Sequence, residues 1–273
     1  MSRRIASAVV AGLAVLSLVA TGSALAAAPW NHDLASGLGP PDWGSLDPAY
    51  EACATGTSQS PIDFTGTTRG GGAALRFGYH EHELVVENTG HVIEVPAPDG
   101  AHDTLSIGGQ TYTLTQFHFH APSEHTIDGR SFDLEAHLVH TSATGQLAVV
   151  GVLMDVGGHP NQLVDEIFEH APEVAGEETE VDVEFSADEL LPRSTHGGPV
   201  SLLTRYFSYS GSLTTPGCSE PVAWLVAKDP ITVSADAVEQ MHHLVSLFPG
   251  YDGFPDNNRP VQPLNGRQVT SRG

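Results

Sequence analysis

Three histidines on two consecutive extended segments form the pattern with the clearest chemical content in this sequence. His118 and His120 alternate with Phe117 and Phe119, and His137 lies in the next extended segment. In a β-strand, residues two apart share a face at a separation of about 7 Å. Two neutral imidazoles on such a face suit a zinc ion, which requires further ligands for tetrahedral geometry. We expect His137 to come from an antiparallel neighbour and complete a three-histidine zinc site.

Residues beside these histidines are of types that orient metal ligands. Metal-bound imidazoles usually donate their second ring nitrogen to a carbonyl or carboxylate oxygen. Gln116 and Glu135 each stand two residues before a candidate ligand and on the same strand face, so we expect them to hold the imidazoles. His140 faces the other way and is interpreted as a core histidine.

A second His-x-His pair is explained by chance. Fifteen histidines in 273 residues produce about one such pair at random, and the sequence contains two. His80 and His82 belong to a charged stretch with Glu81 and Glu83. We interpret this pair as surface residues.

Composition predicts a strand-and-turn protein and excludes one class of partner. The chain has 29 Gly, 19 Pro and a formal net charge of −22. Frequent glycine and proline with few helical periods favour a mainly β fold. Lys228 is the single lysine, and without a basic face neither nucleic acid nor an anionic membrane surface is expected as a partner.

The periodicities predict one β-rich domain with a few peripheral helices. The expected strands lie at residues 82–87, 91–95, 111–120, 132–140, 147–155, 181–185, 206–209 and 222–228. The expected helices lie at residues 161–170, 186–191 and 234–248.

The N-terminus has the order of a secretory signal peptide. Arg3 and Arg4 precede an apolar run, and small residues ending at Ala26 follow it. We expect a signal peptide over residues 1–26, a single domain over 27–273, and export to the periplasm or the cell exterior. A membrane anchor is the alternative, but the apolar run is short for a bilayer. We therefore expect no stable membrane insertion after cleavage, and leave the twin-arginine route open.

Two cysteines, Cys53 and Cys218, remain in the exported chain. In an oxidising compartment an even number of cysteines favours a disulfide. Two buried free thiols are the alternative.

Six motifs, in order, resemble the α-class carbonic anhydrases, in particular their exported bacterial branch. They are Gln59-Ser-Pro-Ile-Asp63, Gln116-Phe-His-Phe-His120, Ser123-Glu-His-Thr-Ile-Asp128, Glu135-Ala-His-Leu-Val-His140, Tyr209-Ser-Gly-Ser-Leu-Thr-Thr-Pro216 and Asn257-Asn-Arg-Pro-Val-Gln-Pro263. The resemblance implies a single domain around a twisted, mostly antiparallel ten-stranded sheet, with zinc in a cone-shaped cleft. It also implies that the disulfide joins Cys53 to Cys218.

The resemblance assigns a reaction and roles to individual residues. It implies reversible hydration of carbon dioxide to bicarbonate and a proton by zinc-bound hydroxide, with weak ester hydrolysis as a side activity. His118, His120 and His137 correspond to the zinc ligands. Thr214 corresponds to the residue that accepts from the hydroxide and donates to Glu124, and His91 to the proton shuttle. The positions of the substrate pocket are Val139, Val149, Leu213, Thr215, Val222 and Trp224.

Two departures from the family pattern bear on the mechanism, and two rival functions stay open. Trp30-Asn-His32 stands where the family often has Trp-x-Tyr, and Glu94 stands where an amide is usual. The rivals are a zinc-binding or adhesive protein that keeps the fold without catalysis, and a zinc esterase. A zinc peptidase is not expected, because the sequence has no His-Glu-x-x-His helix. A homodimer is compatible with the sequence.

Overall fold

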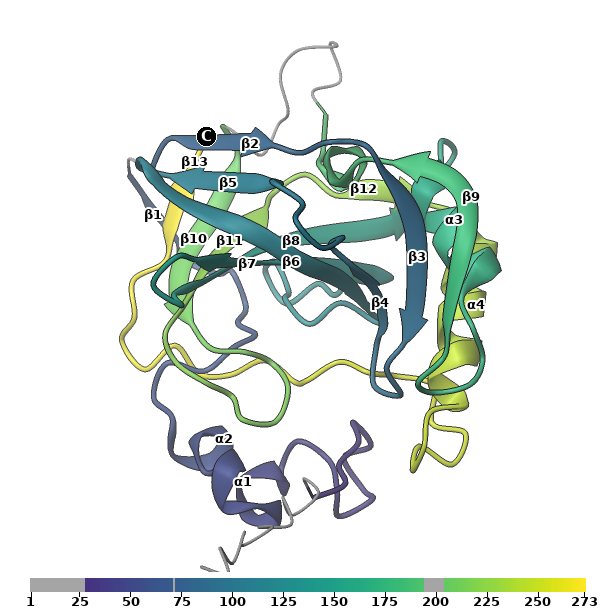
Figure 1. Cartoon of the computed structure of the whole chain (residues 1–273). Coiled ribbons are helices and arrows are strands. Elements are labelled where there is room, and N and C mark those ends of the chain that lie inside the picture. The colour runs from purple at the N-terminus through teal and green to yellow at the C-terminus, as the bar shows by residue number, and fades with distance from the viewer. Residues whose placement is uncertain (1–27, 71, 194–203) are drawn as a thin grey trace, which may run out of the picture.

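The computed structural model describes residues 28–70, 72–193 and 204–273 (Figure 1). The expected signal peptide at residues 1–26 lies outside the described residues. Among the helices that are described, none has both the length and the apolar character needed to cross a membrane.

One large twisted sheet contains the thirteen strands of the described residues (Figure 1). The strands are β1 (Thr68–Arg69), β2 (Leu75–Gly78), β3 (His82–Asn88), β4 (Ile93–Pro96), β5 (Thr104–Ile107), β6 (Gln110–His120), β7 (Leu134–Ser142), β8 (Leu147–Val156), β9 (Glu178–Phe185), β10 (Tyr206–Gly211), β11 (Val222–Ala227), β12 (Ile231–Val233) and β13 (Thr270–Arg272).

Strand pairing is mostly antiparallel, as expected. The sheet runs β1-β13-β10-β11-β8-β7-β6-β4-β3-β9, and β12, β2 and β5 pair beside this path. Among these thirteen strands, the parallel pairs are β1 with β13, β11 with β8, and β12 with β8. The mainly β fold is confirmed. The expected ten strands match the length of the main path, and the three short strands beside it raise the number.

Helical segments are short and peripheral. They are α1 (Trp43–Leu46), the 3₁₀ turn η1 (Pro48–Tyr50), α2 (Ala52–Thr55), α3 (Gln162–His170), the 3₁₀ turn η2 (Ala187–Leu190) and α4 (Ala235–Ser246). The two longer helices begin at side-chain caps, since Asn161 accepts from the Val164 N–H and Ser234 from the Ala237 N–H. In Figure 1, α3 and α4 lie together beside the sheet, whereas α1 and α2 lie at its lower edge.

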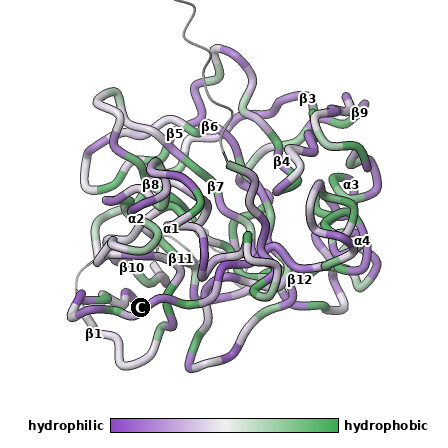
Figure 2. The backbone as a smooth tube through the Cα atoms, turned by 90° about the horizontal axis from the view of Figure 1, so that it is seen from below, coloured by the Kyte–Doolittle hydropathy of each residue, from purple (hydrophilic) through white to green (hydrophobic). Residues whose placement is uncertain are grey.

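The strands β6, β7 and β8 separate two apolar layers. Phe117 and Phe119 on β6 are buried in the larger cluster, where Phe119 lies 5.0 Å from Phe168 of α3 between ring centroids. The opposite face carries a smaller cluster that includes Trp224. Figure 2 shows the resulting mixture of hydrophobic and hydrophilic residues along the strands and helices. Alternation thus anchors β6 by one face and leaves its other face for the candidate ligands.

The second His-x-His pair is only partly at the surface. His80 is 64% exposed, but the side chain of His82 is 19% exposed. Both imidazoles lie within hydrogen-bond distance of the buried Asp103 carboxylate, at 2.9 and 2.8 Å. The surface interpretation is therefore right for His80. It is wrong for most of the His82 ring, because this ring hydrogen-bonds to the buried Asp103 in the loop before β5.

His140 is a buried histidine whose burial should make the fold sensitive to acid. Its Nε2 lies 2.8 Å from the Tyr79 hydroxyl, and burial lowers its pKa to about 4. A histidine with a lowered pKa stabilises the fold above its unfolded-state pKa, and this stability is lost as the pH falls through about 6.5 toward 4.

We predict that His140→Gln weakens this dependence on pH. Between pH 7 and pH 5 the wild-type free energy of unfolding should fall by about 2 kcal/mol more than that of the variant. Denaturant unfolding at both pH values measures the difference. His159→Gln removes an exposed histidine and should show the same fall in the free energy of unfolding between pH 7 and pH 5 as the wild type. An equal fall in all three proteins would contradict the prediction.

Candidate active site

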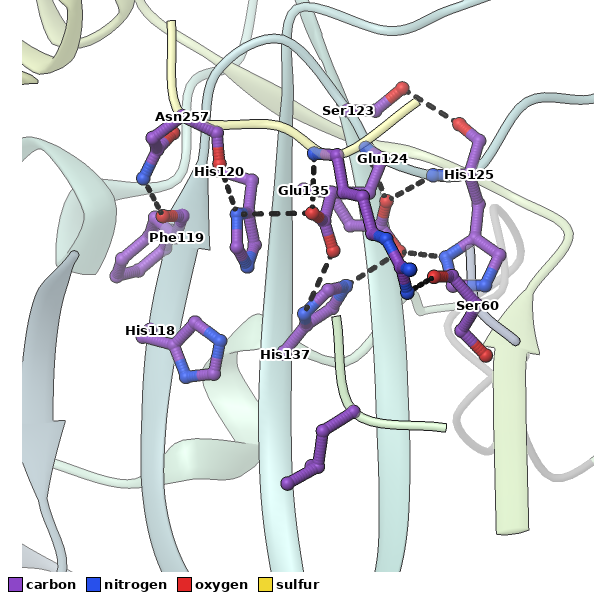
Figure 3. Close-up of polar contacts among 12 residues, drawn as sticks. Ser60, His118, Phe119, His120, Ser123, Glu124, His125, Glu135, His137 and Asn257 are labelled. Atoms are coloured by element: carbon purple, nitrogen blue, oxygen red, sulfur yellow. Dashed lines mark hydrogen bonds and ion pairs between the residues drawn. The ribbon is translucent and has the colours of Figure 1, made fainter. Parts of the chain in front are cut away.

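Three imidazoles converge between β6 and β7. The antiparallel register places His118 opposite His137 and His120 opposite Glu135. One ring nitrogen from each of His118, His120 and His137 lies within 4.8 Å of the other two, and Figure 3 shows the rings close to one another. The expectation that these strands are antiparallel neighbours is confirmed, and the register brings the three rings together.

Hydrogen bonds fix the orientation of the first two rings. The Gln116 Oε1 atom lies 2.8 Å from His118 Nδ1, and the Asn257 carbonyl oxygen lies 2.8 Å from His120 Nδ1. Both carbonyl oxygens accept, so each Nδ1 carries the proton and each Nε2 presents a lone pair. Sequence reasoning located Gln116 but missed Asn257, because a backbone carbonyl 137 residues away has no side-chain signature.

His137 is contacted at Nε2, whereas His118 and His120 are contacted at Nδ1. Its Nε2 lies 3.0 Å from Glu135 Oε1, although the angles fall short of a regular hydrogen bond, and its Nδ1 lies 3.8 Å from Glu124 Oε2. The contact with Glu135 leaves Nδ1 as the nitrogen available to a cation.

The donor set fits zinc. The Nε2 atom of His120 is buried and has no hydrogen-bond partner among the described residues. Burial lowers the pKa of all three histidines, to about 4 for His120, so the imidazoles are neutral at pH 7. Three neutral histidine nitrogens around a shared point are a common donor set of catalytic zinc sites, and a buried nitrogen without a partner is rare unless it binds something.

Glu135 is a buried carboxylate at the centre of a hydrogen-bond network. Its Oε2 accepts from the backbone N–H groups of Glu124 and His125, and its Oε1 lies 2.8 Å from His125 Nδ1. Burial acts to raise the pKa of Glu135, but His125 and His137 hold it well below its usual value. The Tyr209 hydroxyl, 2.7 Å from His125 Nε2, closes the network. His125 and Tyr209 were not predicted as site residues, although both lie within the quoted motifs.

Glu124 is the second buried carboxylate. Its Oε1 accepts from the Arg259 backbone N–H at 2.8 Å, whereas its Oε2 has no regular hydrogen bond to the residues that the structure describes. Burial raises the pKa of Glu124 to about 7, and His137, the Arg259 N–H and the Thr214 hydroxyl all act to lower it. Thr214 is therefore close enough to Glu124 to interact with its carboxylate, as the resemblance implies.

A cavity of about 300 Å³ is lined by two of the three histidines, His118 and His137. Five of the six expected pocket residues line it, namely Val139, Val149, Leu213, Thr215 and Trp224. Val222 does not; it is fully buried in the apolar cluster, two residues before Trp224 on β11. Trp30, Thr89, Val92 and Glu94 line the cavity without having been predicted to do so.

His91 lies on the cavity wall against an indole. Its ring stacks on Trp30 with centroids 3.8 Å apart and planes 8° from parallel. Burial lowers the pKa of His91 to about 4. Nearby, burial and the charge of Glu87 raise the pKa of Glu94 to about 7. Trp30 lies in an irregular N-terminal segment, so no periodicity in the sequence indicated this stack.

A disulfide joins Cys53 to Cys218 across 165 residues, which excludes two free thiols. It connects α2 to the loop that carries Thr214 and Thr215. The Arg259 guanidinium reinforces this junction by donating to the carbonyl oxygens of Cys53 and Ser60.

A protein-family model matches most of the chain, including all three histidines and both buried carboxylates. The model described as eukaryotic-type carbonic anhydrase matches residues 38–273. The chain belongs to this family. The resemblance to α-class carbonic anhydrases is therefore confirmed, and the chain is classed as an enzyme of that family, which is generally metal-dependent.

Similar carbonic anhydrases come from several bacteria. A carbonic anhydrase of Neisseria gonorrhoeae is 39% identical over 94% of both chains. One from Klebsiella pneumoniae is 36% identical over 89% of this chain and 91% of its own length. The solved structure of the α-carbonic anhydrase of Thermovibrio ammonificans, in complex with the inhibitor sulfanilamide, matches with a TM-score of 0.78 and 37% identity. This match covers 89% of this chain and 99% of that one.

We predict that removing the disulfide destabilises this carbonic anhydrase strongly. The paired substitution Cys53→Ala with Cys218→Ala should lower the free energy of unfolding by about 5 kcal/mol, because the unfolded chain gains the freedom of a long open loop. Denaturant unfolding measures the loss. Reducing agent should destabilise the wild type similarly and leave the variant unaffected; a wild type insensitive to full reduction would contradict the prediction.

Proposed function

We propose that this carbonic anhydrase reversibly hydrates carbon dioxide to bicarbonate and a proton, with a zinc ion held by His118, His120 and His137. The observation that carries the proposal is the convergence of three neutral imidazoles beside a cavity, one with a buried nitrogen that has no hydrogen-bond partner in the described part of the chain. A bound zinc ion would supply a water ligand with a pKa of about 7, a general value for which carbonic anhydrase itself is the reference case.

The protein's first task is to keep the ligand set neutral and oriented. Gln116, the Asn257 carbonyl and Glu135 each contact the imidazole nitrogen that faces away from the cluster. Neutral ligands leave the charge of the cation undiminished. Such outer contacts also fix the tautomer and angle of each ring, which is how they tune metal affinity.

The second task falls to Thr214 and Glu124. A threonine hydroxyl can act as an acceptor toward the nucleophile when its own proton is donated elsewhere, and the Glu124 carboxylate is the acceptor that supports this role. A cation beside His137 Nδ1 would be close to Glu124 Oε2 and would favour the ionised carboxylate. Thr214 would then orient the nucleophile toward the carbon atom.

The third task is to hold a substrate that has no net charge. Carbon dioxide offers little for ionic groups to bind, so an apolar wall suits it. Val139, Val149, Leu213 and Trp224 provide such a wall in the same cavity as His118 and Thr214. An activated ester could enter the cavity as a slow alternative substrate; ester cleavage faster than carbon dioxide hydration would favour the esterase function instead.

His91 is proposed as the proton shuttle to bulk solvent. It lines the cavity and is partly exposed. With its pKa near 4, the stacked ring takes up few protons at pH 7. Shuttling therefore requires the ring to leave Trp30 and reach water, where a histidine pKa returns to about 6.5.

We further propose export of the chain, with cleavage near residue 26 and one domain over 27–273. The N-terminal order of charged, apolar and small residues supports export. The disulfide also supports it, because such bonds persist in oxidising compartments.

Substitution of one ligand tests the zinc site. His118→Ala should lose both stoichiometric zinc and carbon dioxide hydration, since two remaining imidazoles hold the cation weakly. Elemental analysis and a stopped-flow hydration assay measure the two properties. His80→Ala removes a largely exposed histidine of the other His-x-His pair and should keep both; a fully active His118→Ala variant would contradict the site.

Substitution of His91 tests the shuttle. His91→Ala should lower kcat in weak buffer by about tenfold or more and leave kcat/KM for carbon dioxide nearly unchanged, because only the proton-transfer step is slowed. Added imidazole should restore part of kcat. An unchanged kcat in weak buffer would remove His91 from the mechanism.

A further inference from the structure

One carboxylate in the cavity has no role in the chemistry described above. Glu94 lies on β4 and pairs with His118 of β6 in the antiparallel register, so the two side chains share a face of the sheet. Both residues line the cavity. Among the described residues that line it, Glu94 is the single carboxylate, and none is a lysine or an arginine. The wall beside the candidate metal site therefore carries an acidic group and no basic side chain of that kind.

The Glu94 side chain has no partner that would neutralise its charge. It forms no hydrogen bond or ion pair with the residues that the structure describes. It is half-buried, and burial together with the charge of Glu87 raises its pKa to about 7. At pH 8 the carboxylate is therefore mostly ionised, and its charge acts on whatever occupies the cavity.

Further carboxylates continue the row from Glu94 to the edge of the sheet. Glu94 pairs with Glu87 of β3, and Glu87 pairs with Glu178 of β9. Glu94 and Glu87 are half-buried, whereas Glu178 is exposed. Like charges directly opposite each other destabilise a pair of strands, so strand pairing does not account for this row. Its charges have one sign, and they reinforce the charge that Glu94 presents to the cavity.

A single ionised group in a cavity sorts ligands by their charge. The energy between two unit charges is several times larger in a partly desolvated site than in water, and a cleft with apolar walls focuses the field. The Glu94 carboxylate opposes a ligand that brings a negative group to this wall and stabilises one that brings a positive group. Carbon dioxide has no net charge and bicarbonate is an anion, so the same charge opposes retention of the product more than entry of the substrate.

We propose that Glu94 is a specificity-determining residue, which makes this cavity prefer ligands that carry a positively charged group over ligands that carry a negatively charged one. This inference rests on the proposed metal site and its hydration of carbon dioxide. It gives a role to a carboxylate at a position where the family pattern usually has an amide.

Ligands that share one metal-binding group and differ in the charge of a remote substituent test the selectivity. Benzenesulfonamides are the probe, because the related enzyme of Thermovibrio ammonificans binds sulfanilamide. The three probes carry a para-carboxylate, a para-carboxamide or a para-aminomethyl group. Isothermal titration calorimetry with the zinc-loaded protein at pH 8 measures their affinities without turnover. Affinity ratios within one protein cancel any effect of a substitution on the shared metal-binding group.

Replacement of Glu94 should change these ratios in opposite directions. In Glu94→Gln the carboxylate probe should gain about tenfold in affinity relative to the neutral carboxamide probe, because the repulsion is removed. The aminomethyl probe should lose affinity relative to the carboxamide by a similar factor. Glu94→Asp keeps the charge and should keep ratios close to those of the wild type.

Two further variants separate the cavity charge from the net charge of the protein. Glu83→Gln removes an exposed carboxylate of β3 that does not line the cavity, and it should leave the ratios unchanged. Glu87→Gln removes a charge one strand farther from the cavity, and it should shift the ratios less than Glu94→Gln.

Several outcomes would overturn the proposal. They are unchanged ratios in Glu94→Gln, equal shifts in Glu94→Gln and Glu83→Gln, and ratios in Glu94→Asp that match those of Glu94→Gln. A stopped-flow assay on the same samples tests the hydration of carbon dioxide separately. A wild type that selects by charge but does not hydrate carbon dioxide would contradict the proposed function alone, and a zinc-loaded wild type that binds none of the three probes would overturn both.

Discussion

The register between β6 and β7 is the constraint on which the whole candidate site depends. It places His118 opposite His137 and His120 opposite Glu135. Because side chains alternate along a strand, a slip of one residue would send the imidazoles into the larger core and the phenylalanines into the cavity. Phe117 and Phe119, nearly fully buried on the reverse face, make that slip costly. Burial of the two phenylalanines on the apolar face of β6 thus fixes the register of the histidines on its other face.

Two buried carboxylates extend this constraint to distant parts of the chain. Glu135 and Glu124 need donors because an unpaired buried charge is costly. Glu135 finds them in the 124–125 backbone and His125, and Glu124 finds one in the Arg259 backbone. The Arg259 side chain in turn holds the segment around Cys53. The disulfide and the C-terminal segment therefore support the same site from outside the central strands.

Features that depend on residues close together in the sequence could be predicted, and contacts between distant residues could not. Alternation is local, so the strands, the ligand trio, and the roles of Gln116 and Glu135 as neighbours of the imidazoles could be proposed from spacing. The family resemblance added Thr214 and Glu124, which spacing alone does not reveal, whereas a disulfide was expected from two cysteines in an exported chain. Contacts formed by backbone groups or irregular segments left no pattern, as with the Asn257 carbonyl and the Trp30–His91 stack.

Two assignments differ from the structure, one made from composition and one from the family resemblance. His82 has polar neighbours, but a single buried carboxylate from a distant loop, Asp103, holds its ring. Val222 was assigned to the pocket by the family resemblance, but it is fully buried and does not line the cavity. For His82, a tertiary contact rather than the polarity of its sequence neighbours determines exposure.

Burial has opposite consequences for the histidines of this protein. It keeps His120 neutral at pH 7, with a pKa near 4, and so ready to bind a cation. The same lowered histidine pKa values make the fold lose stability as the pH falls from about 6.5 toward 4. In this range the unfolded chain binds protons that the folded chain does not bind. For the proposed shuttle His91 burial is a disadvantage, since it lowers the pKa of the stacked ring to about 4. A ligand must stay buried and a shuttle must reach water, which is why rigid strands suit the first role and the rim beside Trp30 suits the second.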